Sequence, residues 1–324
     1  MKIRSISKIV PAITGTSTRL IGTVDIDGSG TYHALGEVDP FILLSGGVIR
    51  QHGKPLFGPH PHRGHSVVSL LLNGRISSWD SFSNQVTTIS APASYWVDAG
   101  SGIFHDELSV IDNESDPQER MAVLQLWVGV REEDRLKPPT AQYDTNLPTE
   151  DILDPQGQKV IGMIRYFVSN EKTSIRTPHP ITVALMQQQA GTTCHLPVPT
   201  SHGGFIVNLN GSDMIDDSGP TETPATFCGV TPTAVYDVAV LDNNNESGDD
   251  ENANQVVEIK TSSKGPATYL MCTGERMKDV WCKKLVANGA IIAATPEEAR
   301  EIAVQADGCS KRGLAGGSYA PFGL

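Results

Sequence analysis

The chain has 324 residues, which is enough for two domains of about 150 residues each. Its residues are 39% hydrophobic and 19% charged, the composition of an ordinary globular protein. The formal net charge of −12 argues against direct binding to nucleic acid or to an anionic membrane surface, because both carry negative charge.

The cysteines and the hydropathy of the chain argue against a disulfide-rich, secreted or membrane-spanning protein. There are five cysteines and no CxxC pair, which argues against a disulfide framework and against a thiolate zinc site. The first residues lack the apolar core of a secretory leader, and no apolar run is long enough to span a bilayer. We therefore expect a cytoplasmic protein, or a nuclear one if the organism is a eukaryote.

The first half of the chain alternates short apolar runs with turn residues. These runs end at Gly, Pro, Asn or Asp, which is typical of β-strands and not of helices. The Asn73-Gly74 pair between two of the runs favours a type I′ hairpin turn. The predicted strands are VVSLLL (67–72), RISSWDSF (75–82), ASYWVDAG (93–100) and MAVLQLWVGV (121–130).

The second half of the chain repeats this pattern after a polar, proline-rich stretch that is typical of a linker. We therefore predict a first domain at 1–135, a linker at 136–157 and a second domain at 158–324. Strand-like runs in the second domain lie at 160–168, 181–187, 203–211, 234–241 and 267–274.

One helix is predicted near the end of the chain, from Pro296 to about residue 306. Thr295 is a suitable N-cap, proline is favoured at the first helical position, and Glu298 completes a capping box. The predicted fold class is therefore all-β, with two antiparallel barrels and one short C-terminal helix.

Two triplets, His60-Pro61-His62 and His105-Asp106-Glu107, carry the chemistry. In a strand, residues i and i+2 point to the same face, so each triplet projects two metal-binding side chains in one direction. His62 and His105 are 43 positions apart, which allows the chain to return beside its starting strand. The pattern predicts one metal ion bound by His60, His62, His105 and Glu107.

The predicted ligand set limits the metal. Three imidazoles without a thiolate suit Fe(II), Mn, Ni, Cu or Zn, and not calcium or magnesium. Four protein ligands on a six-coordinate ion leave two positions for water, substrate or O₂, an arrangement common in O₂ chemistry at non-haem iron. Fe(II) is the favoured ion, and a zinc ion closed at four ligands with a structural role stays open as an alternative.

Three blocks resemble the pirin family of the cupin superfamily: DPFILLSGG (39–47), FGPHPHRGHSVVSLLLNGRISSWDSF (57–82) and APASYWVDAGSGIFHDE (91–107). The resemblance implies a bicupin of two jelly-roll-like barrels that face each other, with a metal only in the first. It places the metal ligands of the family on His60, His62, His105 and Glu107. It also places an aromatic residue of the pocket mouth on Phe57, while His65 is interpreted from its position as a residue of the pocket wall or of the structure.

Two functions follow from the resemblance. The first is a quercetin 2,3-dioxygenase-like enzyme that acts on a flavonol or a related aromatic enol with O₂, with Glu107 as ligand and candidate general base. The second is a non-catalytic, iron-dependent, redox-sensing adaptor or transcription co-regulator that binds a protein partner. Ser66 and Ser101 stand where the family usually has Glu and Arg, so the charge and hydrogen bonding of the pocket are expected to differ from those of the family.

Overall fold

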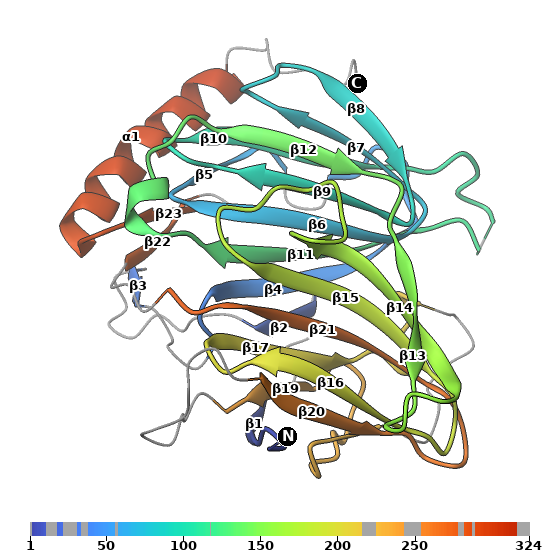
Figure 1. The fold of residues 1–324 in the computed structure, drawn as a ribbon. Helices are drawn as coiled ribbons and strands as arrows, with labels where there is room; N and C mark the ends of the chain where they lie inside the picture. The colour runs from blue at the N-terminus through green and yellow to red at the C-terminus, as the bar shows by residue number, and fades with distance from the viewer. Residues whose placement is uncertain are drawn as a thin grey trace. The chain divides into compact units, whose positions relative to one another are not determined.

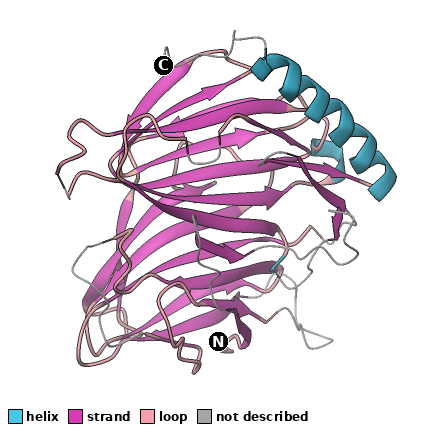
Figure 2. Cartoon of the chain, turned by 180° about the vertical axis from the view of Figure 1, so that it is seen from behind, coloured by secondary structure: helices cyan, strands magenta, loops and turns pink. Residues whose placement is uncertain are grey.

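The computed structural model shows a protein built almost entirely of β-strands (Figures 1 and 2). It describes residues 2–10, 18–21, 31–33, 38–55, 58–116, 118–215, 225–242, 254–277, 282–286 and 289–315. One α-helix, α1 (Pro296–Ala315), and one short 3₁₀ helix, η2 (Glu132–Asp134), accompany the strands in these ranges. The predicted all-β class with a C-terminal helix is confirmed.

Two compact units make up the chain, and neither is continuous in sequence. The first, here called the site unit, contains residues 22–35, 46–145 and 277–324. The second, here called the companion unit, contains residues 1–21, 36–45 and 146–276. This division differs from the predicted domains at 1–135 and 158–324, because the last 48 residues group with the site unit and not with the segment that precedes them.

Two sheets form the site unit. The first has the order β3-β22-β23-β5-β10-β7-β8, and the strands of the second lie in the order β12-β9-β6-β11-β4. The strands of the first sheet are β3 (Thr31–His33), β22 (Cys282–Val286), β23 (Gly289–Ala293), β5 (His60–Arg63), β10 (Ile103–Val110), β7 (Arg75–Asp80) and β8 (Val86–Ser90). Those of the second are β12 (Thr140–Asp144), β9 (Ala93–Asp98), β6 (His65–Asn73), β11 (Met121–Gly129) and β4 (Phe41–Ile49). Residues 41–45 of β4 and strand β2 (Thr18–Ile21) are counted with the companion unit.

The companion unit also contains two sheets. The larger has the order β1-β19-β17-β21-β15-β14-β13 and the smaller the order β16-β20-β18. The larger is built from β1 (Ile6–Val10), β19 (Val238–Leu241), β17 (His202–Asn208), β21 (Ala267–Glu275), β15 (Ile181–Gln188), β14 (Val160–Ser169) and β13 (Thr149–Leu153). The smaller is built from β16 (Thr193–Pro199), β20 (Asn254–Lys260) and β18 (Thr226–Phe227).

The stretch predicted as a linker, 136–157, contains strands β12 and β13. Strand β12 pairs with β9 in the site unit, and β13 pairs with β14 in the companion unit. Its polar composition reflects edge strands, which keep much of their surface in solvent and therefore tolerate charged residues.

The Asn73-Gly74 pair does not form the predicted hairpin. Strand β6 ends at Asn73 and β7 begins at Arg75, yet the two strands belong to different sheets. Only Gly74 has a positive φ, of 76°, whereas a type I′ turn requires positive φ at both central residues. The pair instead marks the corner at which the chain passes from one sheet to the other.

Helix α1 begins as predicted and ends later. The Glu298 amide donates to the Thr295 hydroxyl at 3.2 Å, while the Glu298 carboxylate accepts from the Ala294 amide at 3.3 Å. The helix continues to Ala315 instead of ending near residue 306, because no proline follows before residue 321 and glycine in a helix costs only about 1 kcal/mol. Figure 1 shows α1 beside β22 and β23. No helix in the part of the chain that the structure describes has the length and apolarity needed to cross a membrane.

Two adjacent glycines of β4 offer a matched test of the packing. A Cβ at Gly46 would lie 2.2 Å from the Val123 carbonyl oxygen, whereas a Cβ at Gly47 would meet nothing within 4 Å. We expect Gly46→Ala to lower the free energy of unfolding by about 1–3 kcal/mol, because backbone must move to make room. Gly47→Ala should change it by less than about 0.5 kcal/mol. Urea unfolding of both variants measures the difference, and equal losses would contradict this account.

Candidate metal centre

Strands β5 and β10 bring three histidines together. The two strands pair antiparallel, with His105 opposite His60 and Ile103 opposite His62. His60 and His62 point to one face of β5 because they are two residues apart, and the pairing directs His105 to the same face. All three side chains are at most 1% exposed, so the site lies in the interior of the site unit.

The Nε2 atoms of these histidines converge. The Nε2 of His105 lies 3.1 Å from that of His62 and 3.0 Å from that of His60. One ring nitrogen from each of the three side chains falls within 4.8 Å of the others. The His60 Nδ1–H donates to the Gly58 carbonyl at 2.5 Å, so the Nε2 of a neutral His60 carries a lone pair.

Burial keeps this cluster neutral. It lowers the pKa of His60 to about 4, and it lowers the pKa of His62 and of His105 well below the ordinary value, with neighbouring histidines adding to the effect in these two. Buried imidazole lone pairs that face one another are unfavourable unless they share a proton or a cation. The Nδ1 of His105 is buried and has no hydrogen-bond partner among the described residues. The three histidines therefore fit a metal ion.

Glu107 lies on the same face of β10, two residues beyond His105. Its carboxylate accepts hydrogen bonds from the Ser69 hydroxyl at 2.5 Å and from the Gln125 amide at 2.8 Å, both on the opposite sheet. Trp127 Nε1–H donates to the Gln125 side-chain oxygen at 3.0 Å, which fixes the orientation of that amide. Burial raises the pKa of Glu107 to about 7, although the bond from Ser69 lowers it.

Glu107 is not a member of the group that lies within 4.8 Å, which contains the three histidines alone among the described residues. Glu107 lies in the same interior as the three histidines, and its predicted role as fourth ligand stays a prediction. Sequence reasoning missed Ser69, Gln125 and Trp127. Gln125 could have been recognised from the sequence as a candidate site residue, because it is the one polar side chain in the apolar run MAVLQLWVGV.

The remaining residues predicted for the site fall in different places. Phe57 lies outside the described residues. His65 is buried behind His62, with its Nε2 at 3.0 Å from the His62 Nδ1. Ser66 donates to Asp98 at 2.6 Å within the second sheet, and the Ser101 amide donates to the Lys137 carbonyl at 2.9 Å.

A strand from the end of the chain supports the histidine strand. β23 runs parallel to β5, with Ala290 opposite His62. The two backbones approach so closely that a Cβ at Gly289 would lie 1.8 Å from the Pro61 carbonyl oxygen and 3.1 Å from the His60 ring. Residues more than 220 positions apart therefore share the sheet that carries the site.

Gly289→Ala should weaken metal binding without removing any ligand. The added methyl group must push β5 away from β23, which misplaces His60 relative to His105. We expect a loss of about 10–100-fold in nickel affinity, the range seen when the support of a metal ligand is removed. Nickel titration of the purified variant measures it, with Gly47→Ala as the control. Wild-type affinity in Gly289→Ala would show that β23 does not hold the ligand strand in place.

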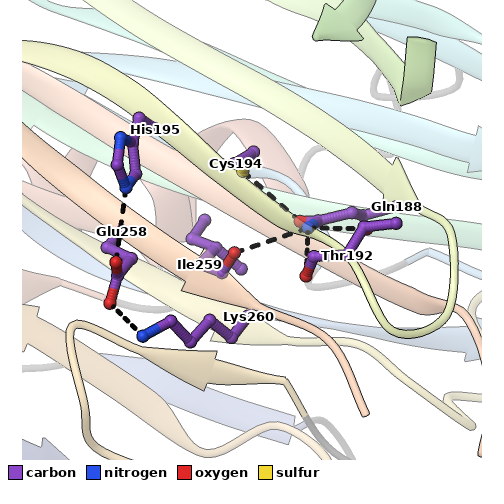
Figure 3. Close-up of polar contacts among 7 residues, drawn as sticks. All are labelled: Gln188, Thr192, Cys194, His195, Glu258, Ile259 and Lys260. Carbon is purple, nitrogen blue, oxygen red and sulfur yellow. Dashed lines mark hydrogen bonds and ion pairs between the residues drawn. The ribbon is translucent and has the colours of Figure 1, made fainter. Parts of the chain in front are cut away.

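The companion unit has no comparable histidine cluster in the ranges that the structure describes. His195 lies on its surface, 37% exposed, and contacts Glu258 at 3.3 Å (Figure 3). The buried Gln188 side chain instead donates to the Thr192 and Ile259 carbonyls and accepts from Cys194 and Tyr269. Both polar atoms of the Gln188 amide therefore have hydrogen-bond partners in this interior.

Comparison with known proteins agrees with this architecture. The family model described as Pirin matches residues 24–128. Mouse pirin is 30% identical over 183 residues, which cover 56% of this chain and 59% of the mouse protein. A Pseudomonas aeruginosa protein named "Putative quercetin 2,3-dioxygenase" is 27% identical over 194 residues, 58% of this chain and 66% of that protein. The matched segments thus span about three fifths of the length of these relatives.

Two solved structures share the fold. Quercetin 2,3-dioxygenase from Acinetobacter baumannii aligns with a TM-score of 0.66 at 18% identity, covering 96% of this chain and 98% of that one. The bacterial pirin YhhW from Escherichia coli, in complex with nickel(II), aligns with a TM-score of 0.52 at 14% identity, covering 84% and 97%. Antiparallel two-sheet units with a histidine cluster inside one of them define a cupin protein. The chain therefore has the bicupin fold, and over residues 24–128 it is similar to the pirin family.

Proposed function

We propose that the protein is a metal-dependent dioxygenase that acts on a flavonol such as quercetin or on a related aromatic enol. The convergence of three buried, neutral histidines on one point carries the proposal. The names of the Pseudomonas relative and of the Acinetobacter structure support the substrate class. Their identities of 27% and 18% leave the particular enol to experiment.

His60, His62 and His105 would hold the metal, with Glu107 as fourth ligand. The close approach of one ring nitrogen from each of the three histidines suits a divalent transition metal. Fe(II) is the proposed ion, with Mn, Ni, Cu and Zn as alternatives, and the nickel in the Escherichia coli structure supports a divalent transition metal.

The bound metal would supply Lewis acidity and one-electron chemistry toward O₂ at its open positions. Glu107 would accept the proton of the enol hydroxyl on a carboxylate oxygen. Ser69 and Gln125 hold this carboxylate from the opposite sheet and stabilise its charge. Burial of the histidines excludes bulk water from the reacting groups.

Oxygen uptake tests this proposal. The purified protein is loaded anaerobically with Fe(II), and O₂ consumption is followed after quercetin is added. We expect flavonol-dependent uptake in the wild type, none in His62→Ala, and wild-type uptake in His195→Ala. Stoichiometric metal with no uptake from quercetin or from other flavonols would overturn the enzyme and favour the adaptor that binds a protein partner.

A further inference from the structure

A fourth histidine stands behind the metal centre. His65 is the first residue of β6 and is 1% exposed. Its Nε2 lies 3.0 Å from the Nδ1 of His62, on the side of that ring away from the Nε2 cluster. Its own Nδ1 lies 3.1 Å from the Arg63 carbonyl oxygen. Trp127 packs against both rings, with centroids 5.1 Å from His62 and 5.4 Å from His65.

These contacts determine where the protons lie. A carbonyl oxygen only accepts hydrogen bonds, so the His65 Nδ1 must carry the proton in that contact. The Nε2 of a neutral His65 then has a lone pair and accepts from His62. His62 must in turn carry its proton on Nδ1, which leaves its Nε2 bare and directed at His60 and His105. The chain of contacts from Arg63 to His62 therefore selects the metal-binding tautomer.

We propose that His65 is a positioning residue that holds His62 in the tautomer and orientation required for metal binding. The inference rests on the proposed metal site and goes beyond it, because it assigns a role to a residue that does not touch the metal. A hydrogen-bond acceptor behind a ligand histidine raises the basicity of its other nitrogen and limits rotation of the ring. Here an imidazole supplies what a carboxylate or a backbone carbonyl supplies at most metal sites.

A second set of contacts ties this pair to Glu107. Trp127 touches both His62 and His65 and donates through Nε1 to Gln125, which donates to Glu107. One continuous arrangement in the interior of the site unit thus orients a ligand histidine and the candidate base. Loss of the His65 acceptor should affect His62 most directly, because the His62 Nδ1 makes its hydrogen bond to His65.

Two variants of His65 separate hydrogen bonding from packing. His65→Phe keeps an aromatic ring against Trp127 and removes the acceptor. His65→Gln can place an amide oxygen near the position of the His65 Nε2 and keeps the acceptor. We expect nickel affinity to fall by about 10–100-fold in His65→Phe and to recover most of that loss in His65→Gln. Thermal unfolding of both variants controls for loss of fold.

Nitrogen-15 NMR of the metal-free protein supplies a second readout that does not depend on activity. The imidazole signals of His62 should show a protonated Nδ1 in the wild type and in His65→Gln, and a mixture of tautomers in His65→Phe. Wild-type affinity in a folded His65→Phe, or a wild-type His62 protonated on Nε2, would overturn the inference. Metal binding without O₂ uptake would instead count against the proposed enzyme and leave the role of His65 standing.

Discussion

Replacing His105 by alanine should lower the affinity for nickel by about 10²–10³-fold. Four-ligand zinc sites bind with about 10–16 kcal/mol, so one ligand contributes about 3–4 kcal/mol, and each 1.4 kcal/mol is tenfold. His105 is the sensitive position because its Nε2 lies within 3.1 Å of both other ring nitrogens. Isothermal titration of the metal-free protein with Ni(II) measures the change.

His195→Ala is the matched control for this loss. It removes the same side chain from the surface of the companion unit, where His195 contacts Glu258. Its nickel affinity and stoichiometry should equal those of the wild type. Because His105 is fully buried, near-UV circular dichroism must show that His105→Ala is folded. A folded His105→Ala with wild-type affinity would rule out the histidine cluster as the metal site.

The affinity for metal should also fall as the pH is lowered through about 7, and Glu107 should be the cause. Burial raises the pKa of Glu107 to about 7, so below that value the carboxyl group is protonated and must release its proton to bind a metal. Below pH 7, the affinity for metal should then fall by about tenfold for each pH unit, or by about 100-fold between pH 7 and pH 5. The pKa of His60 is about 4 and those of His62 and His105 are also lowered, so the histidines contribute little above pH 5.

The variant Glu107→Gln separates the proton of Glu107 from the protons of other groups that could make metal binding depend on pH. The amide keeps the shape of the side chain and cannot lose a proton, so the variant should bind nickel more weakly at pH 8 and with almost no dependence on pH between 5 and 7. Competition titrations at four pH values measure how the logarithm of nickel affinity changes with pH, which gives one slope for the wild type and one for Glu107→Gln. Equal slopes in the wild type and in Glu107→Gln would show that Glu107 is not a ligand and would assign the proton to another group.

Much of the site was predictable because it depends on short-range rules. The alternation of side chains along a strand places His60 with His62 and His105 with Glu107, whatever the rest of the fold does. The spacing of 43 residues between His62 and His105 allowed a return to the same sheet, and the register of β5 with β10 shows that return. The cap of α1 at Thr295 is equally local, because an N-cap needs only its own first turn.

Other features escaped prediction because they depend on which strands meet. Asn73-Gly74 has the composition of a hairpin turn, but its two strands pair with β9, β11, β8 and β10 and not with each other. The stretch 136–157 has the composition of a linker, yet two strands form in it because edge positions were available in both units. Local propensity is weak evidence for a strand whose partners lie far away in sequence.

The sequence by itself determined the class of this protein, its strand content and the residues able to bind a metal, since these follow from residue type and from spacings of two. Tertiary structure decided how those residues are held. It placed β23 beside the histidine strand, His65 behind His62, and Ser69 and Gln125 on Glu107. These contacts join segments up to 230 positions apart, and no local pattern specifies them, because they arise only when two sheets close around a common interior.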